Sequence, residues 1–172
     1  VECPVKGCTV EVERQRRRFR LEPDFRCPVH RIYVSPSTFQ YSCVADNLLW
    51  KDAAETELLS DIMSAKRESR MARDNSEDAL TWNIFRYLER NNQMPGLLSF
   101  LIGRPVPQVD LVYWSYSPKA GGVWPEWAQA REEFELRPGL GSEADLIAVS
   151  DTAVFVIEAK LTASNKTAPH NL

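Results

Sequence analysis

The segment that most constrains the fold of this chain is SEADLIAVSDTAVFVIEAKL, residues 142–161. Two apolar runs lie on either side of Asp151 and Thr152, a pattern that predicts two antiparallel strands joined by a tight turn. A turn centred on Asp151 and Thr152 places Ser150 opposite Ala153. The register of the whole hairpin follows from this one pair, because opposed residues in an antiparallel ladder have numbers with a constant sum.

This register predicts a charged cluster at the open end of the hairpin. Asp145 lies opposite Glu158, with their Cβ atoms about 5 Å apart. Side chains alternate between the two faces of a strand, so Lys160 shares the face of Glu158, and Glu143 lies opposite Lys160. Two acids and a lysine are therefore expected together beside strands that are otherwise apolar.

Both faces of the predicted hairpin are apolar. The face that carries the acids also carries Ile147, Val149, Val154 and Val156. The other face carries Leu146, Ala148, Phe155 and Ile157. A sheet that is apolar on both faces needs a covering layer on each side, which predicts an α/β fold with helices flanking a central sheet.

The charged cluster suggests divalent-metal chemistry. Two carboxylates so close raise each other's pKa unless a cation lies between them. Mg²⁺ prefers oxygen ligands and retains waters, one of which can act as a nucleophile, and Lys160 could position that water or stabilise charge on a phosphate. The alternative is an ion pair of Lys160 with Glu158 or Glu143 that closes the sheet. That pairing leaves the second acid, Asp145, unexplained, so we favour a catalytic role.

Two helices are expected upstream. Residues 47–73 predict a helix with a charged outer face and apolar positions at Leu48, Leu58, Ile62 and Met63. Residues 77–91 predict a second helix that begins after a capping residue, for which Asp74, Asn75 and Ser76 are candidates. Its core face is expected to contain Leu80, Ile84 and Leu88, with Thr81 beside them. Glu77 lies on the same stripe, and the helix dipole alone accounts for an acid in the first turn.

The remaining elements are shorter. Residues 31–42 predict a strand and a proline-broken loop, residues 94–103 a helix that ends at Gly103, and residues 108–117 a strand. Residues 125–136 predict a short helix. For Trp124 and Trp127 we favour ordinary packing over stacking on nucleic-acid bases.

Four residues near the amino end have the spacing of a zinc site. Cys3 and Cys8 are separated by four residues, and Cys27 and His30 by two. Zn²⁺ takes four tetrahedral ligands, which short turns supply in pairs. The alternative is two buried free thiols and a surface histidine. Cys43 has no close partner and is expected in the core.

The chain has a net charge of −3, yet one segment, RQRRRFR at residues 14–20, is strongly basic. Local basic clusters can bind phosphate backbones whatever the net charge. The predicted nucleic-acid contacts are Arg14, Arg16, Arg17, Arg18 and Arg20.

The spacing of Asp145, twelve residues, and then Glu158-Ala159-Lys160 resembles the core motif of the PD-(D/E)XK nuclease superfamily. The resemblance covers residues 76–161 and implies a restriction-endonuclease-like fold, a mixed sheet flanked by helices. It implies Mg²⁺ or Mn²⁺ bound by Glu77, Asp145 and Glu158, with Lys160 as the catalytic lysine. The chain departs from the pattern in having no proline before Asp145. Superfamily cores also continue past this lysine with a helix and a strand, so we expect a domain that is incomplete at its carboxyl end, with His170 in a tail.

These observations predict two parts: a zinc-binding β segment at residues 1–46 and a nuclease domain at residues 47–172. The expected activity is metal-dependent hydrolysis of DNA, with RNA as the alternative substrate. By analogy alone, the setting is restriction, defence or repair in a microbial cytoplasm. Further domains or a second copy are potential partners, and no apolar run approaches the roughly 20 residues of a membrane span. The alternative function is a non-catalytic zinc-containing interaction module on a nuclease-like scaffold.

Overall fold

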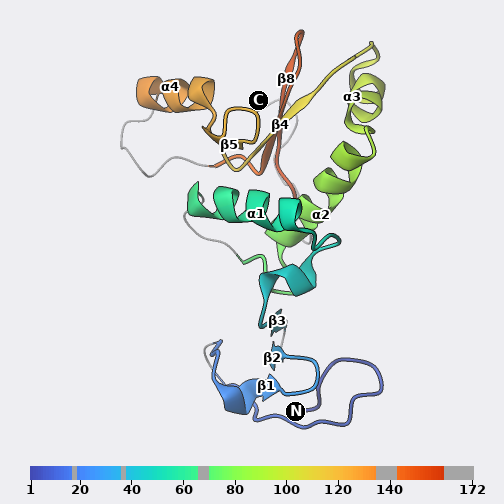
Figure 1. Cartoon of the computed structure of the whole chain (residues 1–172), viewed down its shortest axis with the longest axis vertical. Helices are drawn as coiled ribbons and strands as arrows, with labels where there is room; N and C mark the ends of the chain where they lie inside the picture. The colour runs from blue at the N-terminus through green and yellow to red at the C-terminus, as the bar shows by residue number, and fades with distance from the viewer. Residues whose placement is uncertain (17–18, 36–37, 66–69, 135–142, 161–172) are drawn as a thin grey trace, which may run out of the picture.

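The computed structural model describes residues 1–16, 19–35, 38–65, 70–134 and 143–160. A small N-terminal module, residues 1–41, lies at one end of an elongated molecule, and a larger body of helices and sheet lies at the other (Figure 1). A narrow neck joins them. It contains the short helix η2 (Val44–Asn47).

The N-terminal module contains a three-stranded antiparallel sheet, preceded by the short helix η1 (Pro23–Phe25). Its strands are β1 (Arg26–Cys27), β2 (Ile32–Val34) and β3 (Phe39–Tyr41). The strand predicted within residues 31–42 is confirmed as β2, but the part predicted as a loop includes a second strand, β3; residues 36–37 lie outside the described part. The buried core of the module is Cys3, Val12, Cys27, Ile32 and Val34.

The first helix of the body is shorter than the sequence predicts. α1 spans Ala53–Ala65, and the carboxylate of Asp52 accepts a hydrogen bond of 3.1 Å from the backbone N–H of Glu55. This cap fixes the helix start six residues after the predicted one, Asn47. Leu48 lies before the helix but is buried in the main core all the same.

The predicted start of the second helix is confirmed. α2 spans Glu77–Arg90, and Ser76 Oγ caps it by accepting a hydrogen bond of 3.1 Å from Ala79 N–H. The predicted core face is wrong at two positions, because Leu80 is 36% and Ile84 45% exposed. Trp82 is buried instead.

The rings around Trp82 explain this rotation of α2. Its ring centroid lies 5.3 Å from that of Tyr113 and 6.5 Å from that of Trp114. Burying three large aromatic side chains together removes more apolar surface from water than burying Leu80 and Ile84 would. Thr81 is buried as predicted, and Leu88 packs against the core.

The two shorter helices agree with prediction within the described residues. α3 spans Met94–Ile102 and ends at Gly103, whose φ of 69° is the left-handed conformation common after helices. α4 spans Pro125–Phe134.

The body contains a five-stranded sheet in the order β6-β5-β4-β7-β8. The strands are β4 (Asp110–Tyr113), β5 (Tyr116–Ser117), β6 (Gly122–Val123), β7 (Leu146–Val149) and β8 (Val154–Ile157). Every described pair is antiparallel, so the mixed sheet expected from the resemblance is not seen in this part of the chain. The fold is α/β with two antiparallel sheets.

The single strand predicted for residues 108–117 is instead a hairpin of β4 and β5. Tyr113 pairs with Tyr116, and Trp114 and Ser115 form the turn with φ of 45° and 73°. Two consecutive positive φ values match the twist of a two-residue hairpin turn. Neither residue is a glycine or asparagine, so the sequence carries no strong signal for this turn.

The predicted register of the β7–β8 hairpin is confirmed. Leu146 pairs with Ile157, and Val149 with Val154. The face bearing Leu146 joins the main core with the helices, while Ile147 packs in a second cluster with Trp124 and Trp127. That packing confirms the expectation for the two tryptophans.

Coverage of both faces was predicted for the whole hairpin, and it holds only for β7. β8 is the last strand of the described sheet, with Val154 56% and Val156 65% exposed. The described residues thus leave one face of β8 uncovered.

Candidate functional site

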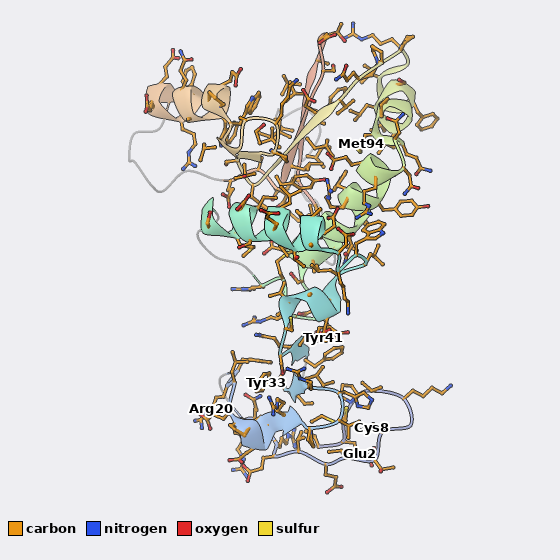
Figure 2. The ribbon with its side chains drawn as sticks, viewed as in Figure 1. Glu2, Cys8, Arg20, Tyr33, Tyr41 and Met94 are labelled. Atoms are coloured by element: carbon orange, nitrogen blue, oxygen red, sulfur yellow. The ribbon has the colours of Figure 1, made fainter. Side chains whose placement is uncertain are left out.

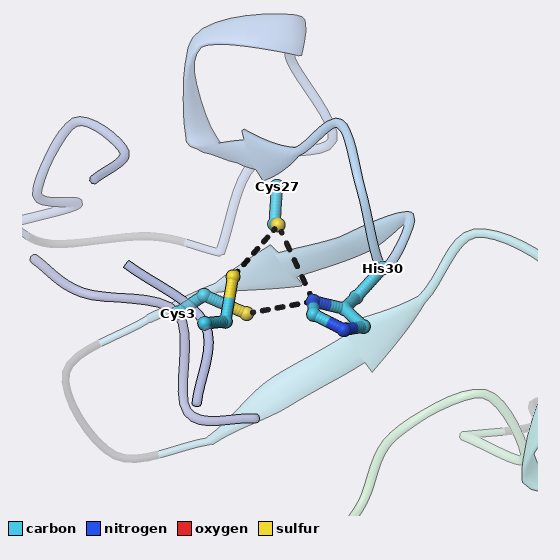
Figure 3. Close-up of side chains that lie close together, drawn as sticks. Cys3, Cys27 and His30 are labelled. Carbon is cyan, nitrogen blue, oxygen red and sulfur yellow. Dashed lines mark hydrogen bonds between the residues drawn. The ribbon is translucent and has the colours of Figure 1, made fainter. Parts of the chain in front are cut away.

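The four predicted zinc ligands converge in the N-terminal module. Their ligand atoms all lie within 4.8 Å of one another. Cys3 Sγ is 3.5 Å and Cys27 Sγ 3.7 Å from His30 Nδ1, and Cys8 Sγ is 4.0 Å from Cys27 Sγ (Figure 3). Sulfur ligands about 2.3 Å from a tetrahedral zinc ion would be about 3.8 Å apart. The cluster therefore has the dimensions needed to hold a metal ion such as zinc.

Local backbone geometry produces this convergence. Cys8 N–H donates to Val5 O at 3.0 Å, and Gly7 adopts a φ of 82°, so the chain turns tightly between the first two ligands. Arg31 N–H donates to Cys27 O at 2.8 Å, which closes a second turn around His30. Each ligand pair is thus carried by its own short turn, as the spacing predicts.

The two buried thiols have different acidities. Burial raises the pKa of Cys3 to about 11. Burial acts on Cys27 in the same direction, but hydrogen bonds from the backbone and ring of His30 outweigh it and lower the pKa of Cys27 to about 7. Because thiolates bind metal, Cys27 is the more readily available of these two ligands near neutral pH.

Cys43 does not belong to this cluster, and its predicted place in the core is wrong. Its side chain is exposed, because Cys43 occupies the position before the short helix η2 at the surface of the neck.

Of the hairpin acids, Asp145 directly precedes β7 and Glu158 directly follows β8, one position beyond the last described pair, Leu146 with Ile157. The carboxylate Oδ2 of Asp145 accepts a hydrogen bond of 2.8 Å from Ala159 N–H. Lys160 Nζ lies 2.5 Å from Glu158 Oε1. Asp145 and the Glu158-Ala159-Lys160 segment are therefore side by side.

Glu77 reaches the same neighbourhood from α2, of which it is the first residue. The pKa of Lys160 is raised, chiefly by its hydrogen bond to Glu158, and the charges of Asp145 and Glu77 add to this effect. Four residues singled out from the sequence thus share one electrostatic environment, although Glu77 is far from the others along the chain.

The three carboxylates do not yet form a compact ligand set. Within the described ranges, the cysteine–histidine cluster is the one group in which three or more Cys, His, Asp or Glu side chains lie close enough to bind the same ion. Magnesium binding by Glu77, Asp145 and Glu158 therefore stays a prediction.

The predicted nucleic-acid contacts lie on a loop of the N-terminal module. Arg14, Arg16 and Arg20 are exposed, and Arg17 and Arg18 fall outside the described residues. Gln15 between them is buried, donating to Val34 O at 2.9 Å and accepting from Arg20 N–H at 2.6 Å. Gln15 thus anchors the loop, and Arg20 lies at the edge of the module (Figure 2).

A buried ionic network between α1 and α2 was not anticipated. The side chain of Glu55 is 3% exposed and accepts hydrogen bonds from Arg86 Nη2 at 2.5 Å and Arg90 Nη1 at 3.0 Å. Arg86 also pairs with Glu89, which accepts a hydrogen bond of 2.9 Å from the Tyr113 hydroxyl. The network fixes α1 to α2 and the sheet. Its charged members are ordinary helix residues in the sequence and Tyr113 is an ordinary strand residue, so no local signal marks them.

A cavity of about 520 Å³ opens beyond the other end of β7. Its lining includes Asp110, Lys119, Trp124 and Asp151, and Lys119 Nζ lies 2.6 Å from Asp110 Oδ2. The cavity is separate from the acids, because Asp145 directly precedes β7, whereas the lining includes Val149 at the opposite end of β7 and Asp110, which pairs with it.

Comparisons of the chain with protein-family models, with curated proteins and with solved structures found no match. The described helices include none that is both long and apolar enough to cross a bilayer.

Proposed function

We propose that the body of this protein is a divalent-metal-dependent nuclease and that the N-terminal module binds zinc. The observation that carries the proposal is that Asp145, held by Ala159 N–H, lies beside the ion pair of Lys160 with Glu158, while the charge of Glu77 also acts on Lys160. These side chains come from the start of α2 and from both strands at one end of the β7–β8 hairpin. Three acids and a lysine of this kind can serve phosphodiester hydrolysis.

The acids would act as ligands for Mg²⁺ or Mn²⁺. When bound, such an ion lowers the pKa of a coordinated water and neutralises charge on phosphate oxygens. Glu158 has a side chain that is 57% exposed, so it can change rotamer at little cost. Asp145 is held in place by Ala159 N–H through one oxygen. A carboxylate accepts through both of its oxygens, so this bond is compatible with metal binding.

Lys160 would stabilise the negative charge that develops on the phosphate as water attacks and the P–O bond breaks. Like an ordinary lysine it is protonated at neutral pH, as this role requires, and the hydrogen bond to Glu158 raises its pKa further. Lys160 pairs with Glu158. Binding of a divalent ion by Glu158 would weaken that pair and leave the ammonium group available to the phosphate.

Nucleic acid is the proposed partner, with DNA favoured over RNA. The exposed arginines of the Gln15 loop supply positive charge for phosphate contacts. Binding through such contacts weakens steeply as salt concentration rises.

The decisive experiment is a cleavage assay of plasmid, single-stranded DNA and RNA with Mg²⁺ or Mn²⁺. Wild-type protein should cut at least one substrate, and Lys160→Ala and Asp145→Ala should not. Lys119→Ala is the matched control, because Lys119 is an exposed, ion-paired lysine at the other end of the sheet. If wild type and all variants leave every substrate intact, the nuclease proposal fails.

A second candidate is a non-catalytic interaction module built on the same scaffold. The ion pair of Lys160 with Glu158 and the bond from Ala159 to Asp145 favour it, because they satisfy these groups without a metal. This candidate predicts nucleic-acid or protein binding by the zinc-loaded chain that is unaffected by omission of Mg²⁺ and Mn²⁺ and by Lys160→Ala.

A further inference from the structure

The segment 71–76 connects the N-terminal module to the first turn of α2. Tyr41 N–H donates to Ala72 O at 2.8 Å, and Asp74 N–H donates to Phe39 O at 3.1 Å. Gln40 and Arg73 form an antiparallel bridge between them. Residues 72–74 thus add a short fourth segment to the edge of the module's sheet, beside β3, although they belong in sequence to the body.

This edge lies in line with the metal cluster. Cys27 pairs with Ile32 across β1 and β2, and Ile32 pairs with Tyr41 across β2 and β3. Tyr41 then bonds to Ala72. One row of backbone pairs therefore runs from a metal-cluster cysteine to a point five residues before Glu77.

The side chain of Asp74 fastens this edge. Its Oδ1 accepts hydrogen bonds from Phe39 N–H at 3.2 Å and from the Thr38 hydroxyl. Asn75 Oδ1 lies 3.1 Å from the same hydroxyl. The next residue, Ser76, caps α2, and Glu77 follows it.

The other side of the segment is held by the body. Asn47 Nδ2 donates to Met71 O at 2.8 Å and to Arg73 O at 2.7 Å. Met71 is 1% exposed in the main core. The start of α2 is therefore fixed from two sides, and the module supplies one of them through Asp74.

The contribution of the module depends on its metal. Two of the buried hydrophobic residues of the module are cysteines of the cluster, Cys3 and Cys27, which leaves four in its described part: Val12, Phe25, Ile32 and Val34. Cores this small need a metal or cross-links to remain folded. Loss of zinc would loosen β3 and release Asp74.

We propose that Asp74 is a positioning residue that couples the zinc module to the acidic site by holding the first turn of α2, and with it Glu77. This inference rests on the proposed function for the role of Glu77 as a metal ligand. Asp74 itself contacts the module and is not assigned a contact with the ion or the substrate.

The test measures Mn²⁺ affinity of the zinc-loaded full chain by isothermal titration calorimetry. Asp74→Ala should weaken Mn²⁺ binding about tenfold, within the range of typical couplings between sites. Asp74→Asn keeps the Oδ1 acceptor and loses only the charge, so it should stay within about twofold of wild type. Asp24→Ala, an aspartate substitution in η1 of the same module, is the control and should change nothing.

Hydrogen exchange supplies a readout that needs no second metal. The amides of Ala79 and Leu80 bond to Ser76, at the start of α2. Their exchange should accelerate in Asp74→Ala and after removal of zinc by a chelator, and not in Asp74→Asn. The amide of Leu98 in α3 should be unaffected in all of them.

The outcomes separate this inference from the nuclease proposal. Wild type that binds Mn²⁺ but cleaves nothing refutes the nuclease and leaves the positioning role to be decided by the variants' affinities. If wild type does not bind Mn²⁺, the proposed metal site is refuted. The hydrogen-exchange measurement then tests by itself whether Asp74 holds the first turn of α2. Wild-type behaviour of Asp74→Ala in both measurements overturns the inference. So does an Asp74→Asn variant as impaired as Asp74→Ala, since charge would then be the cause.

Discussion

The backbone N–H of Ala159 donates a hydrogen bond of 2.8 Å to the carboxylate of Asp145. The bond joins the chain after β8 to the chain before β7, and so ties the first acid to the Glu158–Lys160 pair. Asp145 consequently has a structural role as an acceptor as well as its proposed role as a metal ligand.

Substitutions of Asp145 should separate these two roles. Asp145→Asn keeps an oxygen acceptor and should change the free energy of unfolding by less than about 0.5 kcal/mol, whereas Asp145→Ala should lose about 1–2 kcal/mol. Both should lose cleavage about 100-fold or more, because neither supplies a charged ligand. Urea unfolding and a cleavage assay measure the two effects. Equal destabilisation by Asn and Ala would show that the Ala159 bond contributes nothing.

Glu77→Gln should raise the Mn²⁺ concentration needed for half-maximal cleavage about tenfold, because an amide oxygen is a weaker ligand than a carboxylate. Asp78→Asn in the same helical turn is the control. Its side chain accepts a hydrogen bond from Arg70 N–H, which an amide oxygen can also accept. A cleavage profile of Glu77→Gln that coincides with that of Asp78→Asn would remove Glu77 from the ligand set.

Zinc affinity should fall as pH falls. Cys3, whose pKa burial raises to about 11, is protonated at pH 8 and must lose a proton to bind zinc. Each proton displaced costs about tenfold in affinity per pH unit, so Cys3 alone predicts about a hundredfold loss from pH 8 to pH 6. Cys27, with a pKa of about 7, should add about tenfold over the same range.

Competition with a chromophoric chelator at both pH values measures this dependence, and elemental analysis should find one zinc per chain. Cys43→Ser is the control, since this exposed thiol lies outside the cluster. An affinity independent of pH would mean that the thiols are not the ligands.

Glu55→Ala should destabilise the protein by about 3–5 kcal/mol, because it leaves Arg86, with a side chain only 13% exposed, without its buried partner. Glu57→Ala, an exposed glutamate of the same helix, should stay within about 0.5 kcal/mol of wild type. Thermal or urea unfolding measures both. Similar values for the two variants would contradict a structural role for the network.

Ser115→Gly should stabilise the protein by about 0.5–1 kcal/mol. Glycine adopts the observed φ of 73° without a Cβ penalty, and the buried Ser115 hydroxyl has no hydrogen-bond partner among the described residues. Ser117→Gly should instead destabilise, because Ser117 Oγ accepts a hydrogen bond from Ala120 N–H. Urea unfolding of the two variants should therefore shift in opposite directions.

The features that the sequence predicts well are those fixed by local chemistry. The β7–β8 register follows from one tight turn, and Ser76 and Gly103 mark helix ends through capping. The cysteine and histidine spacing also predicts the metal cluster, because each ligand pair is closed by its own turn.

The features that it misses depend on contacts between distant segments. Leu80 and Ile84 fit a helical stripe, but the choice of face was made by aromatic packing of Trp82 against Tyr113 and Trp114. The pairing of Glu55 with Arg86 joins residues 31 positions apart. No periodicity within either helix can indicate such a pair.

The way the chain passes through the neck has a consequence for dissecting this protein. It crosses from the module to the body through η2, and residues 71–76 of the body return to this point, where Asn47 and Asp74 hold the two segments to each other and to β3. Cutting the polypeptide after residue 46 would separate Asp74 from Phe39, its hydrogen-bond partner in the module. The N-terminal module thus supports the body at residues 72–74, and a shortened protein lacking it would expose the backbone of this segment just before α2.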